Sequence, residues 1–351
     1  MRRLTVLSVA FPFAPVSVDA VGGAEQVLAS LDAALARAGH RSVVLACAGS
    51  IVTGELVAAP AVRGVIDKQA RARVHAALRA AMARVLASRH VDLVHLHGID
   101  FADYLPPPGP PALATLHLPP AWYPRAALRP RRPATFLHAV SKAQDGALRA
   151  LADPAVVLDP VPNGVDVVAL GAARHARRRF ALSLGRLCPE KGQHIALDAA
   201  RRAGVTLLVA GAAFPYPAHQ DYVEREIRPR LDAGRLLGPV GFARKRRLLS
   251  AARCLLIPSL APETSSLVAM EAAACGTPVI AFPSGALPEI VEDGVTGFLV
   301  RDAEGMAEAI GRAHAIDPEA CRRAARARFS RDVMAGAYLR LYERLALAAV
   351  A

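Results

Sequence analysis

Two glutamates, Glu263 and Glu271, stand in a segment whose residue types suit the binding of a phosphorylated ligand. A helix is expected to begin near Ser265, after a short buried strand, and its free backbone amides and positive dipole end would favour a diphosphate. Glu263 could accept hydrogen bonds from hydroxyls beside the phosphate, while Glu271, two turns later, would reach another part of the same ligand. Taken alone, the segment fits an N-capped amphipathic helix with a solvated Glu271 better than it fits a binding site.

A second segment that suits phosphate chemistry runs from Ser183 to Gly192 and joins a strand to a helix. It carries two cations, Arg186 and Lys191, and the glycines at its ends, Gly185 and Gly192, let the backbone turn tightly. When a sugar–oxygen bond breaks, negative charge accumulates on a departing diphosphate. Arginine can meet that charge with forked hydrogen bonds and lysine with a point charge. The alternative is a solvated basic loop.

The first half of the chain carries weaker signals. Gly22 and Gly23, followed by Glu25, open a helix after the first strand and its long loop, and glycines there permit a ligand to approach backbone amides. They do not form the GxGxxG dinucleotide fingerprint. His97 and His117 end two buried strands, where ligands of parallel sheets bind. A single histidine at such a place is usually a core residue, but two at adjacent strand ends are less ordinary.

Together these motifs resemble glycosyltransferase family four, and the resemblance covers nearly the whole chain. Glu263 and Glu271 form the E-x7-E pattern of retaining glycosyltransferases, and the segment continues into a matching run at 275–280. One departure is Thr264-Ser265-Ser266, where the family usually has Gly-Phe-Gly-like residues. Further matches are the Gly-Arg…Glu-Lys-Gly loop at 185–192, the Gly-Gly-x-Glu element at 22–25, and the segments 140–142, 161–166, 238–242 and 288–298.

The resemblance implies a retaining, metal-independent enzyme of the GT-B fold that takes a sugar from a nucleotide diphosphate donor, with a UDP-sugar favoured. Glu263 would contact the hydroxyls of the transferred sugar, and Glu271 would hold the nucleotide ribose. His117 would lie against the sugar, while Arg186 and Lys191 stabilise the leaving diphosphate in a same-face substitution. The other implied donor contacts are Gly22, Gly23, Gly185, Val240, Ser265, Ser266, Leu267 and Val268.

The acceptor is not identified by the sequence: a small molecule, a glycan and a lipid-linked sugar all stay open. Two other functions also stay open, a non-catalytic nucleotide-sugar-binding protein and a nucleotide-sugar 2-epimerase of the same fold. The E-x7-E pair argues against the epimerase, and the presence of both glutamates and both loop cations argues against a decayed enzyme. Candidates for the acceptor side, which could instead simply pack their loops, are His97, Asp100, Trp122 and Tyr123.

The chain is strongly basic, with 43 Lys and Arg against 30 Asp and Glu and a net charge of +13. No partner nucleic acid is expected, because the basic clusters lack the interleaved aromatics on which bases stack. Contact with an acidic membrane surface and simple codon bias explain the charge about equally well, since nearly all the basic residues are arginines. The arginines gather at Arg71, Arg73, Arg79, Arg84 and Arg89 and again at Arg125, Arg129, Arg131 and Arg132.

The 5 cysteines are odd in number and scattered, without a CxxC pair, so they are expected to be small buried residues in a reducing compartment. No histidine or carboxylate spacing suits a zinc site or a manganese clamp, and neither a metal nor another cofactor is expected. The first residues resemble a short signal peptide, but Pro12 and Pro15 interrupt the apolar run. A cytoplasmic protein is favoured, with the inner face of the membrane as an alternative location.

Two Rossmann-like α/β domains of parallel sheet are expected to position these residues across a central cleft. The first would take in residues 1–168, with a C-terminal helix at about 333–351 packing back on it, and the second 178–332. The expected strands are 4–9, 42–47, 91–96, 113–116, 135–140, 180–184, 206–210, 254–257, 278–282 and 298–300. The expected helices are 24–38, 69–88, 193–203, 222–231, 243–252, 267–274, 306–315 and 332–349.

Overall fold

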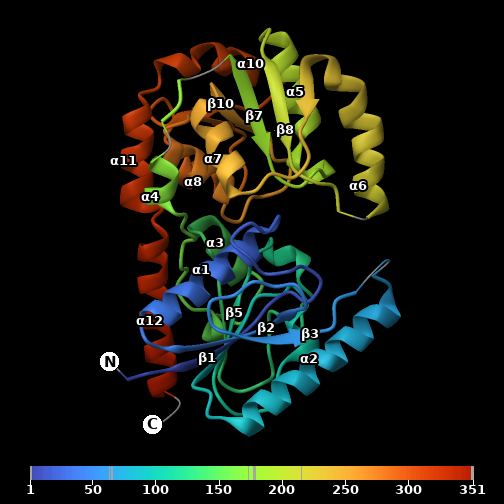
Figure 1. The fold of residues 1–351 in the computed structure, drawn as a ribbon, viewed down its shortest axis with the longest axis vertical. Coiled ribbons are helices and arrows are strands. Elements are labelled where there is room, and N and C mark those ends of the chain that lie inside the picture. Colours follow the sequence, from blue (N-terminus) through green and yellow to red (C-terminus); the bar gives the residue numbers. More distant parts are fainter. Residues whose placement is uncertain are drawn as a thin grey trace. The chain divides into compact units, whose positions relative to one another are not determined.

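The computed structural model describes residues 2–62, 64, 66–172, 174–176, 179–214 and 216–348. The chain divides into two compact units (Figure 1). The N-terminal unit consists of Met1–Pro162 together with Asp332–Ala351, and the C-terminal unit is Asn163–Arg331. No helix among the described residues is long and apolar enough to cross a bilayer.

The N-terminal unit contains a six-stranded sheet in the order β3-β2-β1-β4-β5-β6, in which each neighbouring pair is parallel. The apolar runs that predict strands do form them, and they are buried because helices cover the sheet. The strand at 55–59 was not predicted, since it lies at the sheet edge and is only half-buried. The strands are β1 Thr5–Val9, β2 Arg41–Cys47, β3 Glu55–Ala59, β4 Leu93–Leu96, β5 Ala112–Thr115 and β6 Thr135–His138.

Side-chain caps define where helices of this unit begin. The carboxylate of Asp67 accepts a hydrogen bond from the amide of Ala70 (2.7 Å), and the hydroxyl of Ser141 accepts one from Gln144 (3.2 Å). The last helix, α12, buries Tyr338 in this unit. The helices are α1 Gly23–Arg37, α2 Lys68–Ser88, α3 Lys142–Arg149 and α12 Arg331–Ala348.

The C-terminal unit repeats the architecture with a parallel sheet in the order β12-β11-β10-β7-β8-β9. All five predicted strands form, with ends that shift by a residue at 278–282 and 298–300. The short edge strand at 234–236 was missed because its sequence, Gly-Arg-Leu, has no apolar run. The strands are β7 Phe180–Leu184, β8 Thr206–Ala210, β9 Gly234–Leu236, β10 Cys254–Ile257, β11 Val279–Ala281 and β12 Gly297–Leu299. The two six-stranded parallel sheets confirm the predicted fold class.

The helices α5, α7, α8 and α10 of this unit largely follow the predicted ranges, whereas α4, α6, α9 and α11 were not predicted. Their caps include Asp302 and Asp317, whose carboxylates accept backbone hydrogen bonds at the starts of α10 and α11. The helices are α4 Val167–Gly171, α5 Gln193–Arg202, α6 Pro217–Tyr222, α7 Phe242–Ala251, α8 Leu267–Cys275, α9 Leu287–Ile290, α10 Ala303–Arg312 and α11 Pro318–Arg328.

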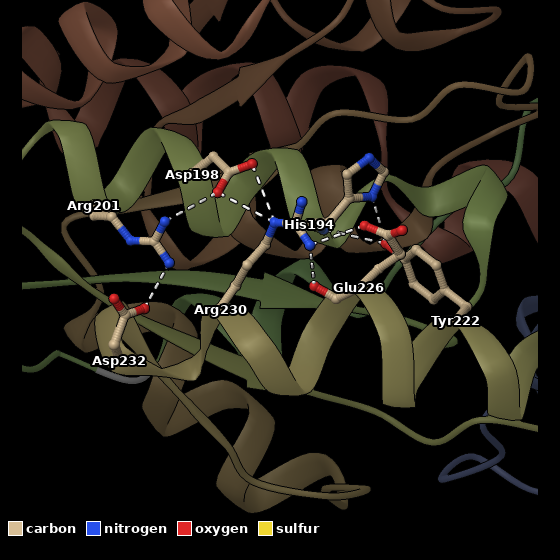
Figure 2. Close-up of polar contacts among 7 residues, drawn as sticks. All are labelled: His194, Asp198, Arg201, Tyr222, Glu226, Arg230 and Asp232. Carbon is tan, nitrogen blue, oxygen red and sulfur yellow. Dashed lines mark hydrogen bonds and ion pairs between the residues drawn. The ribbon is translucent and has the colours of Figure 1, made fainter.

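The helix predicted at 222–231 is wrong as an α-helix. The α-helix α6 ends at Tyr222, and a π-helical turn, Val223–Ile227, and a 3₁₀ turn, Arg228–Ala233, follow. Pro229 cannot donate the backbone hydrogen bond that a continuing helix needs there. Figure 2 shows how this irregular segment is held to α5: Arg230 pairs with Asp198 (3.3 Å), and Asp232 pairs with Arg201 (2.6 Å).

Candidate donor-binding site

The loop after β7 carries the predicted phosphate-binding cations, and a glycine fixes its end. Gly192 has a φ of 62° and precedes α5. A Cβ at this position would lie 2.2 Å from the carbonyl oxygen of Pro258, so both the backbone conformation and the close approach require glycine. At the other end of the loop, the carbonyl of Arg186 accepts a hydrogen bond from the side-chain nitrogen Nε2 of Gln193 (2.7 Å). The loop is therefore tied to the start of α5.

Arg186 and Lys191 have different surroundings within this loop. The guanidinium carbon of Arg186 lies 5.5 Å from the ring centroid of Phe214, in a cation–π contact. Nζ of Lys191 lies 2.6 Å from Oε1 of Glu263. The side chain of Lys191 is only 27% exposed, because it pairs with the predicted sugar-binding glutamate.

Glu263 is held at the carboxyl end of β10 by contacts to its backbone and its side chain. Its carbonyl accepts a hydrogen bond from the amide of Ala286 (2.8 Å), and its carboxylate accepts one from the hydroxyl of Ser259. Burial by itself would raise the pKa of Glu263, but the charge and hydrogen bond of Lys191, with Ser259 and Arg186, lower the pKa below its ordinary value. Glu263 is thus a buried carboxylate that stays ionised at neutral pH.

The start of α8 has the unsatisfied polar groups of an anion site. The hydroxyls of Ser265 and Ser266 are buried and make no hydrogen bond to any described residue. Ser266, the N-cap residue, has a positive φ of 26°, and its side chain does not cap the helix. Leu267 and Val268 follow in the first turn, where backbone amides have no partner within the helix. A phosphate placed here could accept hydrogen bonds from both the hydroxyls and the amides.

Glu271 is buried along α8, so it is not the solvated side chain that the sequence analysis kept as an alternative. Its Oε1 lies 2.5 Å from Nζ of Lys245 on α7, while its Oε2 is buried and has no hydrogen-bond partner among the described residues. Burial raises the pKa of Glu271 despite the opposing charge of Lys245. The sequence analysis missed Lys245, although one signal was there: the only lysines are Lys68, Lys142, Lys191 and Lys245, and two of them pair with the motif glutamates.

The remaining donor-side candidate of this unit, Val240, lies in the loop before α7 and is partly buried against the core. Gly185 lies at the carboxyl end of β7, and its amide donates to the carbonyl of Ala210 (3.1 Å). All the candidates of the C-terminal unit thus follow the carboxyl ends of its parallel strands, the edge at which such sheets bind ligands.

In the N-terminal unit, His97 and His117 are in direct contact. Nδ1 of His97 lies 3.0 Å from Nε2 of His117, and the two rings are stacked. The amide of His117 donates to the hydroxyl of Tyr123 (3.1 Å), so Tyr123 is a buried support for this strand end. Burial lowers the pKa of His117 to about 3, so the ring is neutral at physiological pH. Nε2 of His97 is buried and has no partner among the described residues.

A second pair of histidines lies deeper in the same sheet, around Thr115. The acceptor in each contact can be assigned: Nδ1 of His138 must donate to the carbonyl of Ala139 (3.0 Å), so its Nε2 accepts from Thr115 (2.6 Å). The Thr115 oxygen then accepts from Nε2 of His95 (2.7 Å), and Nδ1 of His95 accepts from the hydroxyl of Tyr342 in α12 (2.8 Å). One consistent set of tautomers therefore links the sheet to the C-terminal helix.

The other candidate residues of the N-terminal unit lie in different elements. Gly22 is the N-cap residue of α1, and a Cβ there would lie 1.9 Å from a carboxylate oxygen of Glu25; Gly23 is the first residue of α1. Asp100 accepts hydrogen bonds from His75 (2.8 Å) and Tyr104 (2.9 Å), which gives it a structural role. Trp122 is 44% exposed on the surface.

Comparisons with known proteins agree with these features. Residues 21–168 match the family model described as glycosyltransferase family 4, and residues 178–315 match the model described as glycosyl transferases group 1. The two matches take in most of the chain, which belongs to this family of glycosyltransferases.

Individual curated relatives of this chain belong to the same class of enzyme. A D-inositol 3-phosphate glycosyltransferase of Mycolicibacterium paratuberculosis is 38% identical over 55% of this chain and 48% of its own length. A glycogen synthase of Mycobacterium tuberculosis is 37% identical over 48% of this chain and 42% of its own length. The chain thus spans about half the length of the curated relatives that it matches. 

The similar structures cover almost the whole chain. AviGT4, a glycosyltransferase involved in avilamycin A biosynthesis, has a TM-score of 0.73 at 25% identity, with 98% of both chains covered. HepE of Anabaena, solved with UDP and glucose, has a TM-score of 0.73 at 22% identity and covers 97% of this chain and 100% of its own. These structures have the GT-B fold, and so does this chain.

Proposed function

We propose that this chain transfers a sugar from a nucleotide diphosphate donor, with a UDP-sugar favoured, to an acceptor hydroxyl with retention of the anomeric configuration. The observation that carries the proposal is the contact between Lys191 and Glu263 at 2.6 Å, which joins the cationic loop to the start of α8. It brings a cation, a buried carboxylate and the unpartnered hydroxyls of Ser265 and Ser266 to one edge of the sheet.

Each group has a role that its chemistry supports. The diphosphate would bind the first-turn amides of α8 and the serine hydroxyls, with Arg186 and Lys191 neutralising the charge that develops on it. Glu263, kept ionised by its surroundings, would accept hydrogen bonds from the sugar hydroxyls. Glu271 would hold the ribose through its unpartnered Oε2. 

In the proposed reaction, the bond between the anomeric carbon and the donor phosphate oxygen breaks, and a bond to the acceptor oxygen forms on the same face of the sugar. The proton of the acceptor hydroxyl passes to the departing phosphate oxygen. Neutral His117, with its ring supported by His97, would present a polar nitrogen to the sugar. Protein cations take the place of a divalent metal in this scheme.

The names of related proteins support a nucleotide-sugar donor without identifying the acceptor. Two of them are glycosyl-transferring enzymes, and the HepE structures contain UDP with glucose or UDP-glucose. The acceptor side is assigned to the N-terminal unit, with His97 and Trp122 as candidates, and the acceptor itself stays open between a small molecule, a glycan and a lipid-linked sugar. We place the enzyme in the cytoplasm.

A hydrolysis screen with nucleotide sugars tests the proposal, because slow transfer to water needs no acceptor. The purified chain should release free sugar and nucleoside diphosphate from one donor. A 2-epimerase would instead return an altered nucleotide sugar, and a non-catalytic binder would leave every donor intact. An Arg186→Ala variant should lower the release by about tenfold or more, whereas Arg225→Ala, which removes an exposed arginine of the π-helical turn, should not change it. Absence of hydrolysis with every donor, or equal hydrolysis by the Arg186 variant, would contradict the proposal.

A further inference from the structure

Three side chains with metal-binding atoms lie close together at the cationic loop. The sulfur of Cys188, a carboxylate oxygen of Glu190 and a ring nitrogen of His219 all lie within 4.8 Å of one another. Cys188 and Glu190 come from the loop itself, and His219 from α6. Sequence patterns do not predict this group, because 29 positions separate His219 from Glu190 and no motif links them.

One atom of His219 and one of Glu190 lack the partners that buried groups normally have, while the thiol of Cys188 and the carboxylate of Glu190 are hydrogen-bonded to each other. Cys188 is 1% exposed and His219 is 9% exposed. Nδ1 of His219 and Oε2 of Glu190 are buried and make no hydrogen bond to any residue that the structure describes. The thiol of Cys188 contacts the carbonyl of Arg186 at 3.8 Å, a weak interaction. Buried nitrogen and oxygen atoms without partners are costly unless a ligand satisfies them.

The backbone on both sides of the cluster is fixed, so the three side chains are held close together. The carbonyl of Glu190 accepts hydrogen bonds from the amides of Leu260 (2.8 Å) and Ala261 (3.3 Å). On the α6 side, the hydroxyl of Tyr222, three residues after His219, accepts a hydrogen bond from the amide of His194 (3.1 Å), and the His194 ring contacts the same hydroxyl (Figure 2). The end of α6 is therefore tied to α5, which directly follows the loop.

We propose that Cys188, Glu190 and His219 form a binding site for a zinc ion, with water as the fourth ligand. A thiolate, an imidazole nitrogen and a single carboxylate are ligands that Zn²⁺ takes in tetrahedral geometry, and sulfur is a poor ligand for Mg²⁺ or Ca²⁺. Binding requires the thiolate, so the thiol proton passes to the solvent as the metal binds. The bound ion would satisfy both buried atoms that now lack partners.

The site would act on the loop and not on the reaction. Cys188 and Glu190 lie between Arg186 and Lys191, and His219 would join this segment to α6. A bound ion would therefore restrict the movement of both cations. The proposal is independent of the transfer reaction, because it rests on the geometry of three side chains, and metal binding can be measured without donor or acceptor.

Competition between the metal-free chain and a chromophoric zinc chelator tests the proposal. The wild-type chain should take up a single equivalent of Zn²⁺, and its melting temperature should rise with the zinc concentration. Cys188→Ala should abolish this uptake, and His219→Gln should weaken it by about tenfold or more, as expected for the loss of one of three protein ligands. Co²⁺ should give a thiolate charge-transfer band with the wild type and none with Cys188→Ala.

Matched substitutions elsewhere in the same unit serve as controls. Cys321→Ala removes another buried cysteine, and His314→Gln removes an exposed histidine; both should bind zinc like the wild type. If Cys188→Ala proves unstable, His219→Gln with the cobalt spectrum decides. A wild-type chain that takes up no zinc in competition, or that loses none of its uptake in the Cys188 and His219 variants, would overturn the proposal.

Discussion

Nζ of Lys191 and Oε1 of Glu263 lie 2.6 Å apart although 72 positions separate them in the chain. The pair joins the two strongest motifs of the sequence, the Gly-Arg…Glu-Lys-Gly loop and the first glutamate of E-x7-E. In the proposed reaction the lysine has two tasks: it keeps Glu263 ionised, and it neutralises the departing diphosphate.

Removal of either loop cation should slow the release of the diphosphate. We expect Lys191→Ala and Arg186→Ala each to lower turnover by about tenfold or more, the loss of one charge-assisted contact. Lys191→Ala also leaves the carboxylate of Glu263 buried without its cation, so Lys191→Gln is the second variant, and thermal melts of both are required. Lys68→Ala, at an exposed lysine of α2, is the control. Wild-type turnover in the Arg186 and Lys191 variants would exclude the loop from the mechanism.

Divalent metal ions should not be needed for the transfer. In the proposed reaction Arg186 and Lys191 supply the positive charge that magnesium or manganese supplies in other enzymes. The one three-ligand cluster found among the described residues contains a thiol, which suits neither ion. Donor hydrolysis by the metal-free chain should therefore run at the same rate with and without added Mg²⁺ or Mn²⁺. A strict dependence on either ion would mean that the leaving group is neutralised in another way.

Stability of the N-terminal unit should fall in mild acid, because His95, His97, His117 and His138 are buried and neutral. Burial lowers the pKa of His138 to about 4 and that of His117 to about 3, and it lowers those of His95 and His97 as well. The unfolded chain binds more protons between these values and the ordinary pKa of 6.5. The free energy of unfolding is therefore at its full value above that pH. It decreases as the pH falls, by about 1.4 kcal/mol per pH unit for each histidine.

Trp122 is the only tryptophan and lies in the N-terminal unit, so its fluorescence reports the unfolding of that unit in urea. The free energy of unfolding should decrease from about pH 7.5 to about pH 5, and His138→Gln should make the decrease shallower. His314→Gln, an exposed histidine of the other unit, should leave it unchanged. A free energy that does not vary across this range would contradict the assignment of neutral buried histidines.

Binding to acidic membranes depends on which arginines are free to contact them. Arg89 pairs with Glu55 (2.6 Å), and Arg132 donates to loop carbonyls, so these two have structural roles. Arg79 is exposed but donates to the carbonyl of Asp103 (2.6 Å), whereas Arg73 and Arg84 are simply exposed on α2. If the acceptor is lipid-linked, the chain should sediment with anionic vesicles at low salt and less at high salt, and Arg73→Gln with Arg84→Gln should weaken the binding. No sedimentation even at low salt would leave codon bias as the explanation of the charge.

The sequence predicts those parts of the fold and site that depend on local patterns. Apolar runs predict ten of the strands, and the E-x7-E segment places both glutamates on or before one helix. The edge strands β3 and β9 are not predicted, because too few of their side chains are buried to produce an apolar pattern. Sequence patterns also do not predict the roles of Lys245, Ser259 and the cluster around His219, because their contacts form only when the chain folds. Lys245, for example, pairs across 26 positions with Glu271, and no spacing rule predicts that pair.

The central claim is that a single nucleotide sugar binds the C-terminal unit, with Glu263 facing its sugar and Glu271 its ribose. Calorimetric titration with UDP, which lacks the sugar, tests this most directly. Glu271→Gln should weaken UDP binding by about 1–3 kcal/mol, the loss of a buried charged hydrogen bond, while Glu263→Gln and the exposed control Glu308→Gln should bind UDP nearly as the wild type does. Equal weakening by Glu263→Gln and Glu271→Gln would contradict this division of roles. Wild-type affinity in all three variants would show that α8 is purely structural and would remove the proposed donor site.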